Sequence, residues 1–155
     1  VYPERPDRAY VAYLDGGAVI LDISDKANPK VITNWRYSPP YNGFCHTVMP
    51  LMSRDMLLVT DECTKDDGLD WPKLGWVVNA STENNLVPMS TLPLPPLESF
   101  VKRGGRYGAH NIHENLPGPA SFRSDNLIVG TFFNGGVRAF DISNAYQPQE
   151  VAYYV

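Results

Sequence analysis

Three histidines are the side chains of this 155-residue chain best suited to hold a metal ion or to transfer protons. His46 lies in one apolar run, and His110 and His113 lie close together in a later one. Neutral imidazole is a common ligand of zinc, iron and copper, whereas calcium prefers oxygen ligands alone. Glu62 and Glu114 are candidates for a carboxylate ligand or for a general acid or base. These residue types predict a site for a transition metal (zinc, iron or copper).

Antiparallel pairing would bring His46 and Glu62 together. The apolar runs on either side of residues 52–56 are expected to fold back on each other, which places His46 opposite Glu62 and Cys45 opposite Cys63. Directly opposed side chains on one face have Cβ atoms about 4.5 to 5.5 Å apart. A slip of one residue would instead oppose His46 to a neighbour of Glu62. The two cysteines are expected to be reduced and buried unless the compartment is oxidising.

The spacing of three between His110 and His113 sends their side chains to opposite faces of an ideal strand, with His110 and Glu114 on the same face. Both histidines can therefore bind one ion only if a bulge interrupts the strand. Two other interpretations stay open. The histidines are either buried groups that hydrogen-bond neighbouring sheets, or acid–base groups that act without a metal.

A short basic loop precedes His110. Residues 102–106 read KRGGR, and Arg103 and Arg106 are predicted to bind an anionic substrate. Solvation of an exposed loop is the alternative explanation for these charges. Neither spacing of glycines that cradles phosphate groups is present, so the sequence gives no support to nucleotide binding.

An internal repeat predicts the elements that position these residues. The segment 15–25 reads DGGAVILDISD, and the segment 134–144 reads NGGVRAFDISN. A weaker copy, WVVNAS, occupies residues 76–81. The distances along the sequence between successive copies correspond to a repeating unit of about 60 residues. The Asp-Gly-Gly and Asn-Gly-Gly turns between β-rich runs predict a hairpin in each of the two clear copies.

Each unit is expected to hold four antiparallel strands, with a leading strand before the hairpin at 46–50 and 110–114. Poor apolar alternation indicates sheets covered on both faces, as in a β-propeller, where leading strands line a central channel. We therefore expect an all-β chain, 1–155, that is one partial propeller domain of about three four-stranded antiparallel blades. The blades are placed at 1–37, 44–95 and 107–155, and the first is incomplete. Since rings typically need four to eight blades, we expect a fragment with a truncated N-terminus whose partners are the remaining blades.

The repeat resembles a known family. The segment VILDIS at residues 19–24 is similar to the strand that names the LVIVD-repeat β-propeller proteins of bacteria and archaea. The strings CHTVMP at 45–50, VTDE at 59–62 and GAHNIHE at 108–114 resemble those of an uncharacterised subgroup. This resemblance implies a propeller fold and no particular activity.

A more distant resemblance concerns histidines on inner strands, which are similar in arrangement to those of the selenium-binding-type methanethiol oxidases. Those proteins are also propellers, and their histidines hold a metal. The present chain lacks a His-His pair, so the resemblance does not carry over their copper chemistry.

The net charge and the lengths of the apolar runs exclude some classes of partner. The net charge of -4 argues against nucleic acid as a partner, and no apolar run reaches the roughly 18 to 20 residues of a membrane span. We predict a binding or scaffolding module that offers a small molecule or a protein a surface at the channel mouth. The alternative is a metal-dependent enzyme, an oxidoreductase or hydrolase, with its His/Glu site at the central channel. The sequence does not assign a cellular compartment.

Overall fold

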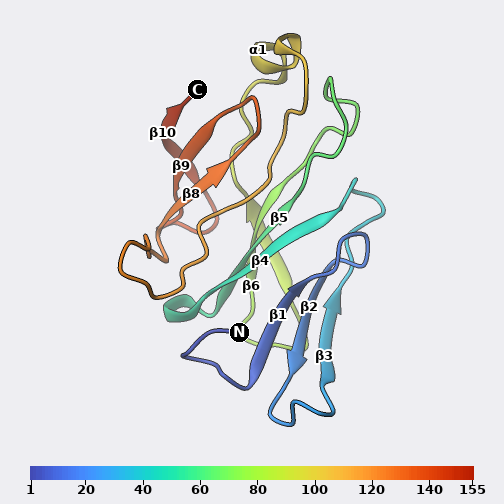
Figure 1. The fold of residues 1–155 in the computed structure, drawn as a ribbon, viewed down its shortest axis with the longest axis vertical. Coiled ribbons are helices and arrows are strands. Elements are labelled where there is room, and N and C mark those ends of the chain that lie inside the picture. Colours follow the sequence, from blue (N-terminus) through green and yellow to red (C-terminus); the bar gives the residue numbers. More distant parts are fainter.

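The computed structural model describes all residues 1–155 and contains three antiparallel β-sheets (Figure 1). The first sheet is formed by β1 (Arg8–Ala12), β2 (Ala18–Asp22) and β3 (Lys30–Trp35). The second is formed by β4 (Cys45–Leu51), β5 (Met56–Asp61), β6 (Gly75–Asn79) and β7 (Val87–Thr91), and the third by β8 (Leu127–Thr131), β9 (Val137–Asp141) and β10 (Gln149–Tyr154). The short helices are η1 (Met52–Arg54), α1 (Leu97–Phe100) and η2 (Val101–Arg103). The predicted all-β class is confirmed, and none of these helices could cross a membrane.

The two Gly-Gly turns have the same geometry, as the repeat predicts. In the first, the N–H of Gly16 donates to Tyr13 and that of Gly17 to Leu14, and the second turn repeats this pattern from residue 132 to residue 136. Gly17 and Gly136 have φ angles of 86° and 79°. A side chain there would also collide with the backbone carbonyl of the neighbouring strand. Glycine therefore fixes both hairpins because it alone fits this backbone.

The prediction of four strands per unit is confirmed for the second sheet only. In the third sheet, residues 107–113 lie beside β8 but make only isolated bridges. The backbone N–H of His110 donates to the carbonyl of Thr131, and that of His113 donates to the carbonyl of Val129. The three-residue step from His110 to His113 therefore lies opposite a step of only two residues in β8. This extra residue is a bulge that interrupts the ladder. In the first sheet, no strand pairs with β1 on the side away from β2.

Apolar packing between the sheets holds the structure together. In the middle sheet, Leu58 and Val77 point into a core shared with the third sheet, whereas Leu57 and Val78 point into a core shared with the first. All four are at most 1% exposed. Burial of a leucine side chain stabilises a protein by about 1.5 to 3 kcal/mol. Because both faces of the middle sheet are covered, its strands show no apolar and polar alternation.

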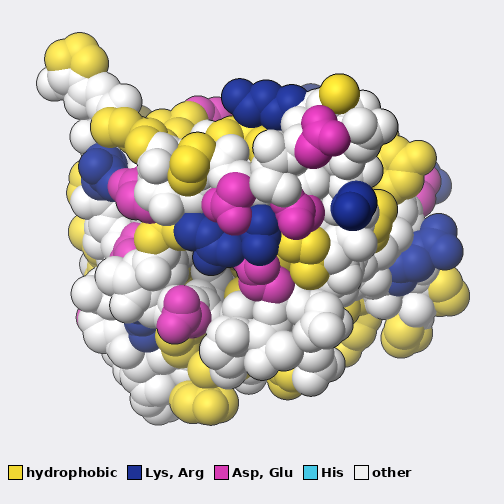
Figure 2. All heavy atoms as spheres, turned by 90° about the horizontal axis from the view of Figure 1, so that it is seen from below, with side chains coloured by type: hydrophobic (Ala, Val, Ile, Leu, Met, Phe, Trp, Pro, Cys, Tyr) yellow, Lys and Arg dark blue, Asp and Glu magenta, His cyan; other side chains and the backbone are white.

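Ion pairs and hydrogen bonds join neighbouring sheets at one end of the molecule. Glu83, in the loop after β6, accepts hydrogen bonds of 2.9 Å from both Arg5 and Arg8 of the first unit. Arg54, on η1, donates to the backbone carbonyls of Asp125, Ile142 and Ser143 in the third unit. Figure 2 shows basic and acidic side chains beside one another on this face.

We predict that Arg54→Ala lowers the free energy of unfolding by about 2 kcal/mol, because it leaves several carbonyls of the third unit without a charged donor. Urea denaturation of the purified chain measures this loss. Arg123→Ala is the matched control, since Arg123 forms a single exposed pair with Glu4 and should contribute less than about 0.5 kcal/mol. Equal losses in the two variants would contradict the role given to Arg54.

Candidate metal centre

Two histidines and one glutamate meet where the second sheet approaches residues 107–113. One ligand atom from each of His46, Glu62 and His110 lies within 4.8 Å of the others. Nε2 of His46 is 3.8 Å from Oε2 of Glu62, and Nε2 of His110 is 3.6 Å from Oε1 of the same carboxylate. Ligand bonds to zinc are about 2.0 to 2.2 Å, which puts two ligand atoms of a tetrahedral site about 3.3 Å apart. Small side-chain adjustments would thus allow all three groups to bind one ion.

The repeat explains why two distant histidines become neighbours. The residue before His46 is Cys45, whose backbone exchanges two hydrogen bonds of 3.0 and 3.1 Å with Leu14, two residues beyond β1. The residue before His110 is Ala109, whose carbonyl accepts a hydrogen bond of 3.0 Å from the backbone of Cys63, just beyond β5. Each histidine therefore follows the point at which its leading strand contacts the preceding unit. The two imidazole rings are 4.6 Å apart between centroids.

The predicted register of β4 and β5 is wrong by one or two positions. Cys45 faces Asp61, and Thr47 faces Thr60, with an irregularity between them that leaves His46 without a direct partner. The predicted opposition of Cys45 and Cys63 is therefore wrong. The side chains of His46 and Glu62 nevertheless meet, because the irregularity lies at the histidine itself.

The negative charge of Glu62 is balanced by the guanidinium group of Arg106. Nη1 of Arg106 donates a 2.9 Å hydrogen bond to Oε1 of Glu62, whose side chain is 16% exposed. The guanidinium lies 4.0 Å from the ring centroid of Phe133, on which His110 also stacks. Burial and the nearby His46 lower the pKa of His110, although Glu62 acts in the opposite direction. A neutral His110 keeps a lone pair free for a metal.

His113 and Glu114 are not brought to this group. Nδ1 of His113 accepts a hydrogen bond from the backbone N–H of Val129, and Nε2 lies 3.3 Å from the carbonyl of Ser124. Burial lowers the pKa of His113. Glu114 is exposed, and its backbone carbonyl accepts a hydrogen bond from Tyr2. The structure thus gives His113 the alternative role, that of a hydrogen-bonding residue between segments.

The two arginines of the basic loop also lie at different places in the fold. Arg106 reaches Glu62, whereas Arg103 lies over the ring of Phe100, 5.0 Å from its centroid. Sequence reasoning missed the contribution of Phe133. Its position just before the Asn-Gly-Gly turn, equivalent to Leu14 before the Asp-Gly-Gly turn, was the available signal.

A buried carboxylate next to the site was also missed. Asp61 is fully buried and accepts hydrogen bonds from the hydroxyl of Tyr37 (2.6 Å) and the backbone of Leu74 (3.1 Å). Burial raises the pKa of Asp61. Both cysteines are free and buried, and burial raises the pKa of Cys45 to about 12 and that of Cys63 to about 11. Neither thiol is therefore set up to act as a thiolate nucleophile near neutral pH.

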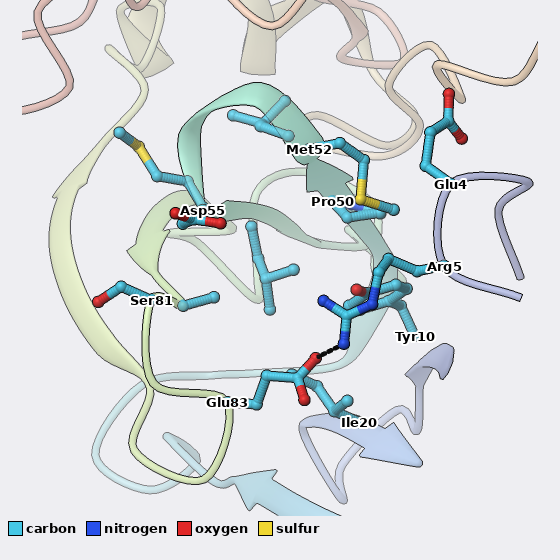
Figure 3. A pocket seen from close by; sticks show the side chains of 13 residues that line it. Glu4, Arg5, Tyr10, Ile20, Pro50, Met52, Asp55, Ser81 and Glu83 are labelled. Atoms are coloured by element: carbon cyan, nitrogen blue, oxygen red, sulfur yellow. Dashed lines mark hydrogen bonds and ion pairs between the residues drawn. The ribbon is translucent and has the colours of Figure 1, made fainter. Parts of the chain in front are cut away.

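A separate pocket of about 260 Å³ lies between the first and second sheets (Figure 3). Its lining includes Tyr10 and Ile20 from the first sheet and Met52 from η1, and the Arg5–Glu83 ion pair lies at its side. None of the three grouped side chains lines it. The candidate metal centre is thus a partly exposed cluster at a different place in the fold.

We predict that the titration of His110 and His113 lowers the free energy of unfolding as the pH falls from 7 toward their pKa values in the folded chain. His110 and His113 have pKa values below the ordinary value of about 6.5, so in this range the unfolded chain binds more protons than the folded chain. NMR titration of the ring protons should give midpoints below 6.5 for both residues. Midpoints above 6.5 would contradict this account of their environments.

The comparisons with known proteins fit the observed sheets. Residues 7–36 match the family model of the LVIVD repeat. No curated protein matches the chain. The matched segment spans β1, β2 and β3, so it corresponds to one complete sheet of the structure. The chain therefore carries an LVIVD repeat, and this repeat forms its first β-sheet.

Proposed function

We propose that the chain is part of a β-propeller and serves as a binding module with a transition metal on its leading strands. The LVIVD repeat and the consecutive packing of three antiparallel sheets support a propeller with blades at 1–37, 44–95 and 107–155. Apolar side chains stay exposed on both outer sheets, with Val31 at 66% and Val151 at 55%. The remaining blades of the same propeller are the partners that would cover them.

The observation that carries the metal proposal is the convergence of His46, Glu62 and His110 within 4.8 Å. Two imidazoles and one carboxylate suit zinc or ferrous iron, and copper is a further candidate. Two of the three groups come from equivalent positions of neighbouring units, so the same packing that forms the core also forms the site. A divalent ion would compete with Arg106 for the carboxylate of Glu62.

A catalytic use of the metal is the second candidate function. Three protein ligands leave at least one coordination position for water or substrate, which is typical of catalytic rather than structural zinc sites. The side chains of His46 and His110 are 30% and 25% exposed, so this position would face solvent. A bound water of lowered pKa would suit a hydrolase, and a redox-active metal would suit an oxidoreductase. Glu62 would then act as a ligand. Glu114 would not share this role, because it is exposed and does not belong to the group of three residues.

We predict that the chain, purified without a metal-affinity tag and treated with chelator, binds about one equivalent of zinc in isothermal titration calorimetry. His46→Ala and His110→Ala should each weaken this binding by about 100-fold or more, because each removes a ligand. His113→Ala is the matched control and should bind zinc with the affinity of the unchanged chain.

Zinc binding below about 0.2 equivalents, or equal affinities in the three histidine variants, would remove the metal centre. Circular dichroism of each variant separates a lost ligand from a lost fold.

A further inference from the structure

We propose that the metal centre takes a small organic carboxylate, which bridges the bound metal and the guanidinium of Arg106. This inference rests on the proposed metal function and names the class of ligand that the site would take.

Arg106 has unused hydrogen-bond donors directed at no protein group. Its Nη1 donates to Oε1 of Glu62 at 2.9 Å and to the carbonyl of Cys63 at 3.3 Å, whereas Nε and Nη2 have no partner in the structure. The side chain is 40% exposed. By contrast, Arg54 uses both terminal nitrogens on protein acceptors. Arg106 therefore presents a free guanidinium edge, and such an edge donates charge-assisted hydrogen bonds to a carboxylate oxygen.

The guanidinium is held in place beside the cluster. It lies 4.0 Å from the ring centroid of Phe133, and the same ring stacks on His110 at 4.6 Å with an interplanar angle of 17°. The backbone of Arg106 and of the preceding residue is also hydrogen-bonded, since the carbonyl of Arg106 accepts from the backbone N–H of Asn134 and that of Gly105 accepts from the backbone N–H of Asp67. A guanidinium that is already ordered loses less freedom when it binds an anion.

The charge of the loaded site favours an anion. The carboxylate of Glu62 and the guanidinium of Arg106 balance each other, and imidazoles that bind a metal ion are neutral ligands. A divalent ion would therefore leave two uncompensated positive charges in a partly buried place. Such charges interact more strongly there than in bulk water, so a negative ligand would stabilise the loaded site.

The surroundings favour an organic carboxylate over inorganic phosphate. One oxygen of a carboxylate would occupy the open metal position, and the other would accept from the free edge of Arg106. Phe133 packs against both His110 and the guanidinium of Arg106, so an aromatic ring rather than a further cation lies beside this place. Arg103 does not add a second cation, because its guanidinium lies over Phe100.

The experiment uses cobalt(II) as a coloured probe of the metal site. The chain is loaded with cobalt, the bound cobalt is measured by equilibrium dialysis, and acetate is then titrated while the visible spectrum is recorded. We expect acetate to half-saturate the spectral change at a concentration about tenfold lower for the unchanged chain than for Arg106→Gln, which lacks the charged hydrogen-bond donor. Arg103→Gln is the matched control and should behave like the unchanged chain.

Two further titrations distinguish the ligand classes. Azide, which needs an open metal position but has no carboxylate group, should respond to Arg106→Gln by less than about threefold. Inorganic phosphate should bind more weakly than acetate, and tighter binding of phosphate would overturn the assignment to carboxylates. Equal acetate affinities in the unchanged chain and in Arg106→Gln would overturn the role of Arg106.

Cobalt retention separates failure of the inference from failure of the metal site. Arg106→Gln should bind cobalt at least as tightly as the unchanged chain, because Glu62 no longer has an ion-pair partner. Loss of cobalt from this variant alone would show that Arg106 supports the site structurally and would overturn its role toward an anion. Absence of cobalt from the unchanged chain would overturn the proposed metal function and this inference together.

Discussion

Apolar packing of one sheet on the next is the constraint on which the rest of the structure depends. The middle sheet has no solvent face, since Leu58 and Val77 enter one core and Leu57 and Val78 enter the other. This arrangement fixes how far each unit is displaced and rotated from its neighbour. Any side chain at an equivalent position in two units is therefore placed at a defined separation from its counterpart. His46 and His110 are such a pair, and their proximity follows from packing that does not involve them.

The glutamate completes the group by a different route. Glu62 follows the last residue of β5, where the backbone leaves its own sheet and its neighbour Cys63 donates to the leading segment of the next unit. The carboxylate thus stands between the two imidazoles, and Arg106 compensates its charge. In this arrangement the basic loop and the acid are parts of one site, although 44 positions separate them in the sequence.

Much of this architecture could be predicted from the repeat. The two Gly-Gly turns specify hairpins because the backbone there requires glycine, and poor alternation indicates sheets buried on both faces. The details that failed depend on single irregularities. A shift of register between Cys45 and Thr47 places Asp61 instead of Cys63 opposite Cys45. A bulge between His110 and His113 interrupts the regular pairing beside β8 in the third sheet. Bulges depend on tertiary packing, so residue spacing alone did not locate them. Phe133 and the buried Asp61 were missed because an aromatic residue beside a turn and a single acid in a strand carry no motif.

The central claim is that packing of equivalent positions creates a binding site for one metal ion. X-ray absorption spectroscopy of the zinc-loaded chain tests this claim most directly, because it reports the types and distances of the ligand atoms. The account predicts two imidazole nitrogens and at least one oxygen at about 2.0 to 2.2 Å, with one imidazole lost in either His46→Ala or His110→Ala. A shell made of oxygen atoms alone, or a shell unchanged in both variants, would contradict it.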